Sequence, residues 1–312
     1  MKISIIGGGN VGSLAALRLA QENIGDIMLI DIVKGLAQGK AYDLEDARSV
    51  LKNNYHVEGS NQIENINGSD IVVVTAGLAR KPGMTREELL SKNALILRDI
   101  CLNIKKYAAG SIVIIVTNPL DLMTYFALKV TGFDSKKLFG MGLSLDGSRF
   151  ANLISKELHH PITDIEACVI GSHGEGMLPL ARFTKIKGTR LTEFLDTTKI
   201  QNLVNKTILR GAEIVGLLGS GSAYFAPSAA ISELVKAVAG NQNKTIGVCA
   251  YLNGEYGIKN LCIGVPCIIN KNGIEKIVDL GLSLEETEAL RKSADSIRAN
   301  IGFLNQFIPN EL

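Results

Sequence analysis

One histidine of this chain has neighbours suited to proton transfer. His173 lies between glycines in the sequence GSHGEG, which leaves the imidazole exposed and lets a substrate approach it closely. An imidazole changes its charge near neutral pH, so it can donate or accept a proton there. The other histidines, His56, His159 and His160, lie in a polar segment or at a predicted helix end. His173 is therefore the candidate acid or base, and a purely structural histidine is the alternative.

An acid and an arginine form a second candidate group. Asp146 and Arg149 are three residues apart in segment 143–157, whose pattern predicts a helix, and this spacing puts both on one face. A guanidinium group can bind a carboxylate through two parallel hydrogen bonds, so Arg149 is suited to an acidic substrate. An ordinary ion pair within the helix is the structural alternative.

Two further arginines lie in the segment GLARKPGMTREELLSKN, residues 77–93. Arg80 and Arg86 flank a Pro-Gly break, and Thr85 with Glu88 predicts a capping box that starts the next helix at about Arg86. A broken loop with two guanidinium groups indicates a lid over an anion. A solvated basic loop is the alternative.

These side chains need a scaffold, and the first 31 residues indicate which one. A β-branched run, residues 2–6, meets Gly7, Gly9 and Gly12 in the spacing GxGxxG, and a helical pattern follows. The glycines allow a tight turn, close approach of a pyrophosphate and close packing of helix on strand. Asp31 ends the second strand, 19 residues past Gly12, where a carboxylate binds a ribose diol and repels a 2′-phosphate. This favours NAD over NADP, with an empty structural turn as the alternative.

Strand and helix patterns alternate through the first half, which predicts a doubly wound parallel sheet of the Rossmann type. Ligands bind beyond the carboxyl ends of such strands, so Thr75 to Gly77 and Val116 to Asn118 join the glycine loop as candidates for the cofactor edge. The second half is predicted to be α+β. Its expected strands are 162–170, 245–252 and 261–269, a hairpin enters 274–278, and its expected helices are 199–218, 228–238 and one starting at Ser283. We expect a dinucleotide-binding domain over 1–143 and a catalytic α+β domain over 144–312.

The composition excludes several classes of protein. The chain has 33 basic and 31 acidic residues in 312, so no strong field points to nucleic acid or an anionic membrane. No segment is long and apolar enough to span a membrane, and the glycines interrupt the apolar N-terminus. Five scattered cysteines predict buried, reduced thiols and a cytoplasmic protein. No metal-ligand spacing is present, so we expect no metal site.

The motifs together resemble the lactate and malate dehydrogenase family over essentially the whole chain. In family order they are GGGNVG, LID ending at Asp31, AGLARKPGMTR, VTNPLD, LDGSR, GSHGE and GSGSAYFAP. The chain is most similar to the malate-specific members of lactate-dehydrogenase-like type. It departs from their usual GGHGD, followed by Thr or Ser, at Ser172, Glu175 and Gly176.

The resemblance implies a role for each candidate residue. It implies that His173 is the acid or base, that Asp146 orients it, and that Arg149 and Asn118 bind the substrate. Arg86 would polarise the substrate carbonyl, and the Asn118–Pro119 bond resembles one that is cis in relatives. The implied cofactor contacts are Gly7, Gly8, Gly9, Asn10, Val11, Gly12, Asp31, Asn93, Val116, Thr117 and Asn118.

Arg80 indicates the substrate. Lactate-specific relatives carry a neutral residue at the matching lid position, whereas malate-specific relatives carry arginine. Burial of a second carboxylate without a cation would be strongly unfavourable, so the resemblance implies the dicarboxylates malate and oxaloacetate. The alternatives are a lactate or other 2-hydroxy acid dehydrogenase and a non-catalytic NAD-binding protein. The resemblance also implies a homo-oligomer, dimer or tetramer.

Overall fold

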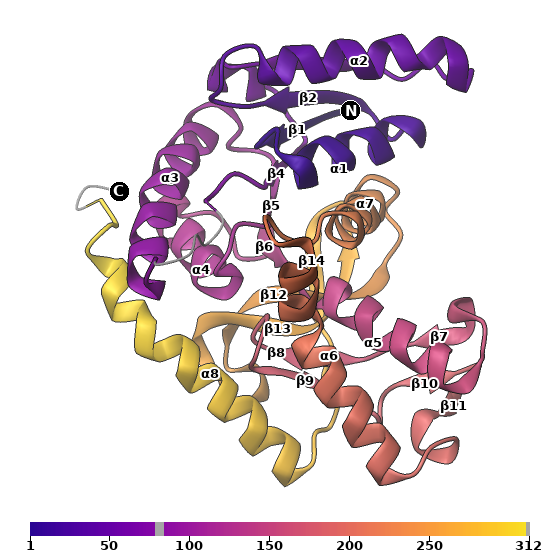
Figure 1. The fold of residues 1–312 in the computed structure, drawn as a ribbon. Coiled ribbons are helices and arrows are strands. Elements are labelled where there is room, and N and C mark those ends of the chain that lie inside the picture. Colours follow the sequence, from indigo (N-terminus) through magenta and orange to yellow (C-terminus); the bar gives the residue numbers. More distant parts are fainter. Residues whose placement is uncertain (79–83, 310–312) are drawn as a thin grey trace.

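The computed structural model describes residues 1–78 and 84–309, and it begins with a parallel sheet (Figure 1). The strand order is β3-β2-β1-β4-β5-β6, the order of a dinucleotide-binding Rossmann sheet, so the predicted fold class is confirmed. The strands are β1 (Lys2–Ile6), β2 (Asp26–Ile30), β3 (Val57–Ser60), β4 (Ile71–Val74), β5 (Ile112–Ile115) and β6 (Leu138–Met141).

Helices cover both faces of this sheet. They are α1 (Asn10–Gln21), α2 (Leu36–Leu51), α3 (Arg86–Tyr107) and α4 (Leu120–Thr131). Figure 1 shows α3 and α4 together on one side of β4, β5 and β6, with α1 on the other side. The central strands β4 and β5 read IVVV and IVII, and all eight residues are buried, as strands covered on both faces require.

The second half extends the same sheet. Strand β12 pairs antiparallel with β6, and β13, β8 and β9 follow in order, with β14 beside β13. The elements are α5 (Leu143–Leu158), β7 (Ile165–Glu166), β8 (Val169–Gly171), β9 (Met177–Pro179), β10 (Lys185–Ile186), β11 (Thr189–Arg190), α6 (Thr197–Leu218), α7 (Phe225–Ala239), β12 (Lys244–Asn253), β13 (Lys259–Asn270), β14 (Gly273–Ile277) and α8 (Leu284–Asn305). Hydrogen bonds between β6 and β12 therefore join the first half of the chain to the second in one sheet. The boundary between two domains at residue 143 stays a prediction.

Most expected elements are present, but the prediction of a single strand over 162–170 is wrong. The segment starts with a 3₁₀ turn, Ile162–Asp164, in which the Asp164 N–H donates to the carbonyl of Pro161 at 3.1 Å. Strand β7 then pairs with β10 in a separate three-stranded sheet, whereas β8 pairs with β13 in the main sheet. The segment changes sheets between β7 and β8, which an apolar pattern alone does not reveal.

Both predicted capping boxes are confirmed. Thr85 accepts a hydrogen bond from the Glu88 N–H at the start of α3, and Ser283 accepts one from the Glu286 N–H at the start of α8. In each case the glutamate carboxylate accepts a hydrogen bond from the backbone N–H of the cap residue, so two otherwise unpaired backbone N–H groups are satisfied. The Asn118–Pro119 bond is cis, as expected.

The three motif glycines differ in what surrounds them. A Cβ at Gly12 would lie 1.9 Å from the Gly7 carbonyl oxygen, and one at Gly7 would lie 2.6 Å from the Ala76 nitrogen. By contrast, a Cβ at Gly9 would meet no atom within 4 Å. Gly12 therefore lets α1 pack closely on the turn after β1, Gly7 lets that turn approach the segment after β4, and Gly9 keeps open the space above the loop.

This difference predicts unequal effects of two matched substitutions on stability. Gly12→Ala should lower the free energy of unfolding by about 1–3 kcal/mol, because the methyl group forces α1 away from β1. Gly9→Ala should change it by less than about 0.5 kcal/mol. Urea unfolding followed by circular dichroism measures both. Equal stability of the two variants would contradict this account of the loop.

Candidate active site

The structure brings three of the predicted residues together. His173 follows β8, while Asp146 and Arg149 lie in the first two turns of α5. The His173 Nδ1 atom lies 2.8 Å from Asp146 Oδ2, and Arg149 Nη1 donates to Asp146 Oδ1 at 3.0 Å. One carboxylate therefore holds an imidazole that is 27 residues away in the chain and a guanidinium group on its own helix.

The surroundings of Asp146 strengthen these contacts. Its side chain is 0% exposed, whereas the side chains of His173 and Arg149 are 17% and 11% exposed. The carboxylate also lies in the first turn of α5, where the helix dipole favours negative charge. Ion pairs in such a setting are only weakly screened by solvent.

The electrostatics favour a protonated His173. Burial alone would lower its pKa, but the charge of Asp146 and the hydrogen bond to it, with a smaller contribution from Asp121, raise the pKa of His173 above its ordinary value. The positive charge of Arg149 opposes this rise. The imidazolium form therefore persists to higher pH than in a free histidine.

Asp121 is a neighbour of the histidine that sequence reasoning missed. Its Oδ2 atom accepts the backbone N–H of His173 at 2.9 Å, and its side chain is buried. Burial raises the pKa of Asp121 to about 6, although the Cys249 thiol and the His173 charge lower it. The available signal was its place in VTNPLD, an acid among apolar residues just past the end of β5.

The loop around His173 is shaped by the residues that depart from the family pattern. A Cβ at Gly176 would lie 2.2 Å from Ser172 Oγ, so the serine side chain occupies the space that Gly176 leaves free. Ser293 of α8 accepts the Ser172 N–H and donates to the Gly176 carbonyl, both at 2.9 Å. The loop thus has room for the side chain of Ser172, and hydrogen bonds to Ser293 attach it to α8.

The predicted cofactor residues lie along the same edge of the sheet, at the carboxyl ends of its parallel strands. Asp31 Oδ2 accepts the Gly8 N–H at 2.7 Å. The amide of Asn93 is buried and bonds to the backbone of Leu78 and of Asn118, at 2.8 Å and 2.7 Å. Thr117 Oγ1 donates to the Ala76 carbonyl at 2.6 Å, and Val116 is half-buried beside it. Asn93 and Thr117 therefore join the segments that follow β4 and β5.

The glycine loop has the features that a dinucleotide requires. A cavity of about 170 Å³ lies over Gly9, Asn10, Val11 and Gly12, and Tyr224 lines its other side. Helix α1 begins there with no side-chain cap, so N–H groups of its first turn are free to bind an anion. The chain thus offers phosphate donors at the loop and the Asp31 carboxylate at the end of β2, which fits NAD.

A larger cavity of about 850 Å³ opens beside the histidine. Asn118, Asp121 and His173 line it, and Ser293 of α8 forms part of the far wall. It offers room for a small substrate next to the imidazole. Arg80 and the side chain of Arg86 lie outside the described part of the chain.

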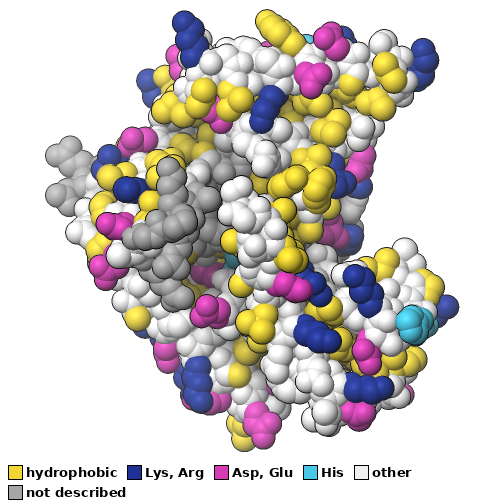
Figure 2. Space-filling model, in the orientation of Figure 1, with side chains coloured by type: hydrophobic (Ala, Val, Ile, Leu, Met, Phe, Trp, Pro, Cys, Tyr) yellow, Lys and Arg dark blue, Asp and Glu magenta, His cyan; other side chains and the backbone are white. Residues whose placement is uncertain are grey.

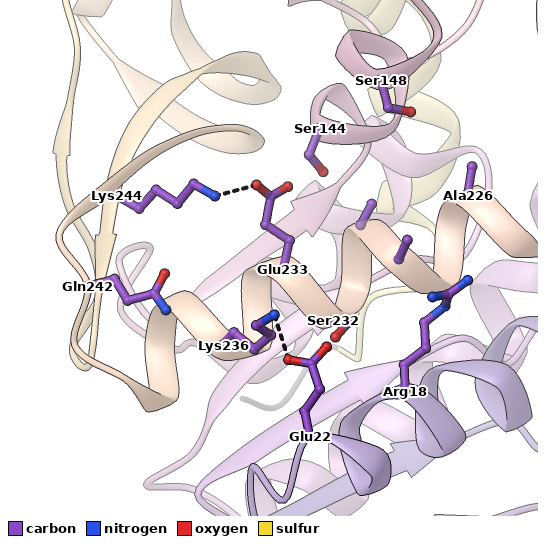
Figure 3. Close-up of a pocket in the computed structure, with 12 residues that line it drawn as sticks. Arg18, Glu22, Ser144, Ser148, Ala226, Ser232, Glu233, Lys236, Gln242 and Lys244 are labelled. Atoms are coloured by element: carbon purple, nitrogen blue, oxygen red, sulfur yellow. Dashed lines mark hydrogen bonds and ion pairs between the residues drawn. The ribbon is translucent and has the colours of Figure 1, made fainter. Parts of the chain in front are cut away.

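Figure 3 shows a different cavity, of about 500 Å³, between α1, α5 and α7. Its lysines are paired, Lys236 with Glu22 at 2.5 Å and Lys244 with Glu233 at 2.7 Å. None of the predicted site residues lines it. Among the described residues no cluster of three metal-ligating side chains occurs, and no helix is long and apolar enough to cross a membrane.

The buried carboxylates predict how the imidazole titrates. Replacing Asp146 by Asn removes its charge and should lower the pKa of His173 by about one to three pH units. Asp121→Asn should lower it by less. NMR titration of the imidazole measures both, with His173→Gln assigning the resonance. An unchanged His173 pKa in Asp146→Asn would contradict the proposed coupling.

Comparison with known proteins agrees with this geometry. Residues 1–140 match the lactate/malate dehydrogenase NAD binding domain, and residues 144–308 match the lactate/malate dehydrogenase alpha/beta C-terminal domain. The malate dehydrogenase of Methanosarcina mazei is 48% identical, with the match covering 97% of this chain and 99% of that protein.

Solved structures give the same result. The malate dehydrogenase of Cryptosporidium parvum has a TM-score of 0.95 and 38% identity, covering 98% of this chain and 99% of that one. The lactate dehydrogenase of the same organism, complexed with lactic acid and nicotinamide adenine dinucleotide, has a TM-score of 0.94 and 35% identity, covering 97% and 98%. The chain therefore belongs to the lactate/malate dehydrogenase family.

Proposed function

We propose that this protein is an NAD-dependent malate dehydrogenase, which interconverts (S)-malate and oxaloacetate. The observation that carries the proposal is the buried Asp146 carboxylate shared by His173 and Arg149, at the same sheet edge as a glycine loop suited to a dinucleotide. The similarity to malate dehydrogenases over nearly the whole chain supports the same activity.

The imidazole is the proton donor and acceptor. Asp146 occupies Nδ1 of His173, so Nε2 is the nitrogen that faces the substrate oxygen. When oxaloacetate is reduced, protonated His173 donates its Nε2 proton to the carbonyl oxygen; when malate is oxidised, the neutral ring takes the hydroxyl proton. When bound, NADH would supply the hydride for the reduction, and NAD⁺ would accept it in the oxidation. Asp146 stabilises the charged ring and fixes its tautomer.

The cations position the substrate. Arg149 binds the carboxylate next to the reacting carbon, and Asn118 adds a hydrogen bond. Arg86 polarises the carbonyl oxygen, and Arg80 pairs with the second carboxylate of the dicarboxylate. Support for the last two roles comes from the charge of these arginines and from their place in the sequence, Arg80 between β4 and α3 and Arg86 at the first residue of α3.

A lactate or other 2-hydroxy acid dehydrogenase is the second candidate. It is favoured by the high structural similarity to a lactate dehydrogenase, with a TM-score of 0.94. The two candidates differ in the charge at position 80. A neutral residue accommodates the methyl group of pyruvate, whereas Arg80 would be left unpaired beside it.

The substrate assignment is tested at Arg80. The parent protein should oxidise NADH rapidly with oxaloacetate and slowly with pyruvate. Arg80→Gln should lower kcat/KM for oxaloacetate by at least about 10³-fold, because a buried carboxylate loses its cation, while it spares pyruvate. NADH absorbance measures both rates.

His173→Asn is the control, since it should abolish turnover with either acid and leave NADH binding intact. A parent protein that prefers pyruvate, or an equal loss on both substrates in Arg80→Gln, would contradict the assignment.

We further propose that the protein is a homo-oligomer, a dimer or tetramer. Large apolar side chains are exposed on α2 and on the segment from α6 into α7, and Figure 2 shows hydrophobic side chains over α2 and around the hollow below it. They are Tyr42, Val50 and Leu51, and Leu209, Val215, Leu217, Leu218 and Phe225. An exposed apolar set of this size is typical of a protein interface.

Leu217 and Leu284 provide a matched test, because both leucines are highly exposed, at 82% and 91%. Leu217→Glu should shift the sedimentation coefficient toward that of a monomer, whereas Leu284→Glu, at the start of α8, should not. Sedimentation velocity measures the assembly. A monomeric parent protein would rule out the oligomer.

A cytoplasmic location and a part in the tricarboxylic acid cycle belong to the same proposal. All five cysteines are free. Burial raises the pKa of Cys168 to about 12, which keeps its thiol protonated and unreactive. Free thiols support a reducing compartment.

A further inference from the structure

We propose that Lys40 is a positioning residue of the dinucleotide site, and that its ammonium group turns the peptide between Gly8 and Gly9 so that the N–H faces the pyrophosphate. The inference rests on the NAD-dependent function proposed above. It assigns a role to a lysine on α2, away from the glycine motif in the sequence.

The contacts of Lys40 converge on one carbonyl group. Its Nζ atom donates to the Gly8 carbonyl at 2.6 Å and to Ser13 Oγ at 2.9 Å. Ser13 Oγ in turn donates to the same carbonyl at 2.9 Å. On the other side of the residue, the Gly8 N–H donates to Asp31 at 2.7 Å. Both backbone polar groups of Gly8 are therefore fixed by side chains.

The direction of the next N–H follows from peptide geometry. In a planar trans peptide the carbonyl of one residue and the N–H of the next point in opposite directions. The Gly8–Gly9 peptide is trans, and its carbonyl points toward Lys40 and Ser13. The Gly9 N–H therefore points away from them, and no hydrogen bond among the described residues uses it.

Gly9 lies where an anion would bind. It is the N-cap residue of α1 and lines the cavity over the loop. A Gly8 carbonyl turned outward would present an oxygen to the phosphates and repel them. Lys40 holds this oxygen inward, so the loop presents a donor in place of an acceptor.

The charge of Lys40 adds to this effect. Its side chain is half-buried, and within residues 1–78 and 84–309 no carboxylate lies within ion-pair distance of its ammonium. A cation without a counter-ion, bonded to the loop that cradles a diphosphate, complements the charge of that ligand. A lysine that merely ties α2 to α1 would affect stability and leave NADH affinity unchanged.

The test compares NADH affinity among variants by the fluorescence of NADH itself. Lys40→Met keeps most of the aliphatic stem but loses the donors and the charge, so its Kd should rise by about tenfold or more. Lys40→Arg retains a charged donor and should restore most of the affinity. Lys52→Met, at the far end of the same helix, removes the same charge and should bind NADH within about twofold of the parent.

Two further measurements separate positioning from general charge and from folding. If Lys40 and Ser13 act through the same carbonyl, the effects of Lys40→Met and Ser13→Ala on Kd should be non-additive in the double variant. The loss should persist in about 0.5 M KCl, where exposed charges are screened. Urea unfolding of each variant reports stability separately.

The outcomes are distinct. A folded Lys40→Met variant that binds NADH within about twofold of the parent would overturn the proposed role of Lys40 and leave the proposed dehydrogenase function standing. So would a loss that high salt removes, or additive effects of the two substitutions. If Lys40→Met fails to fold, unchanged affinity in Ser13→Ala would overturn the proposal. A parent protein that does not bind NADH would overturn both this inference and the proposed function.

Discussion

The buried carboxylate of Asp146 is the contact on which the rest of the site depends. It lies in the first turn of α5 and holds His173 through one oxygen and Arg149 through the other. A buried charge of this kind is tolerated only with cationic partners, so the acid and the two cations stabilise one another. The same contact that makes burial of the carboxylate possible also raises the pKa of His173, so one side chain serves both folding and proton transfer.

The continuous sheet explains why the two halves of the site meet. Strands β1, β4 and β5 end at the glycine loop and at the segments that Asn93 and Thr117 hold together. Strand β13 pairs with β8, so the histidine loop follows directly from the same sheet. Helix α8 then fixes that loop through Ser293. Cofactor edge and acid thus share one rigid framework, and no flexible linker has to bring them together.

The fold was largely predictable because its signals are local. Runs such as IVVV and IVII indicate buried strands, and Thr85 and Ser283 mark helix starts by side-chain chemistry. The short strand β3, with sequence VEGS, has no such pattern and was missed. The contact of His173 with Asp146 was expected only from the family resemblance, since their spacing carries no such information. Asp121 and Lys40 escaped notice because their roles depend on backbone groups, which no side-chain motif specifies.

The interlocked pair Ser172 and Gly176 has a consequence for how this loop can change over evolutionary time. Because the serine hydroxyl fills the volume that a methyl group at 176 would need, the two sites are not free to vary independently. A side chain acquired at 176 therefore requires the hydroxyl at 172 either to rotate away or to be lost.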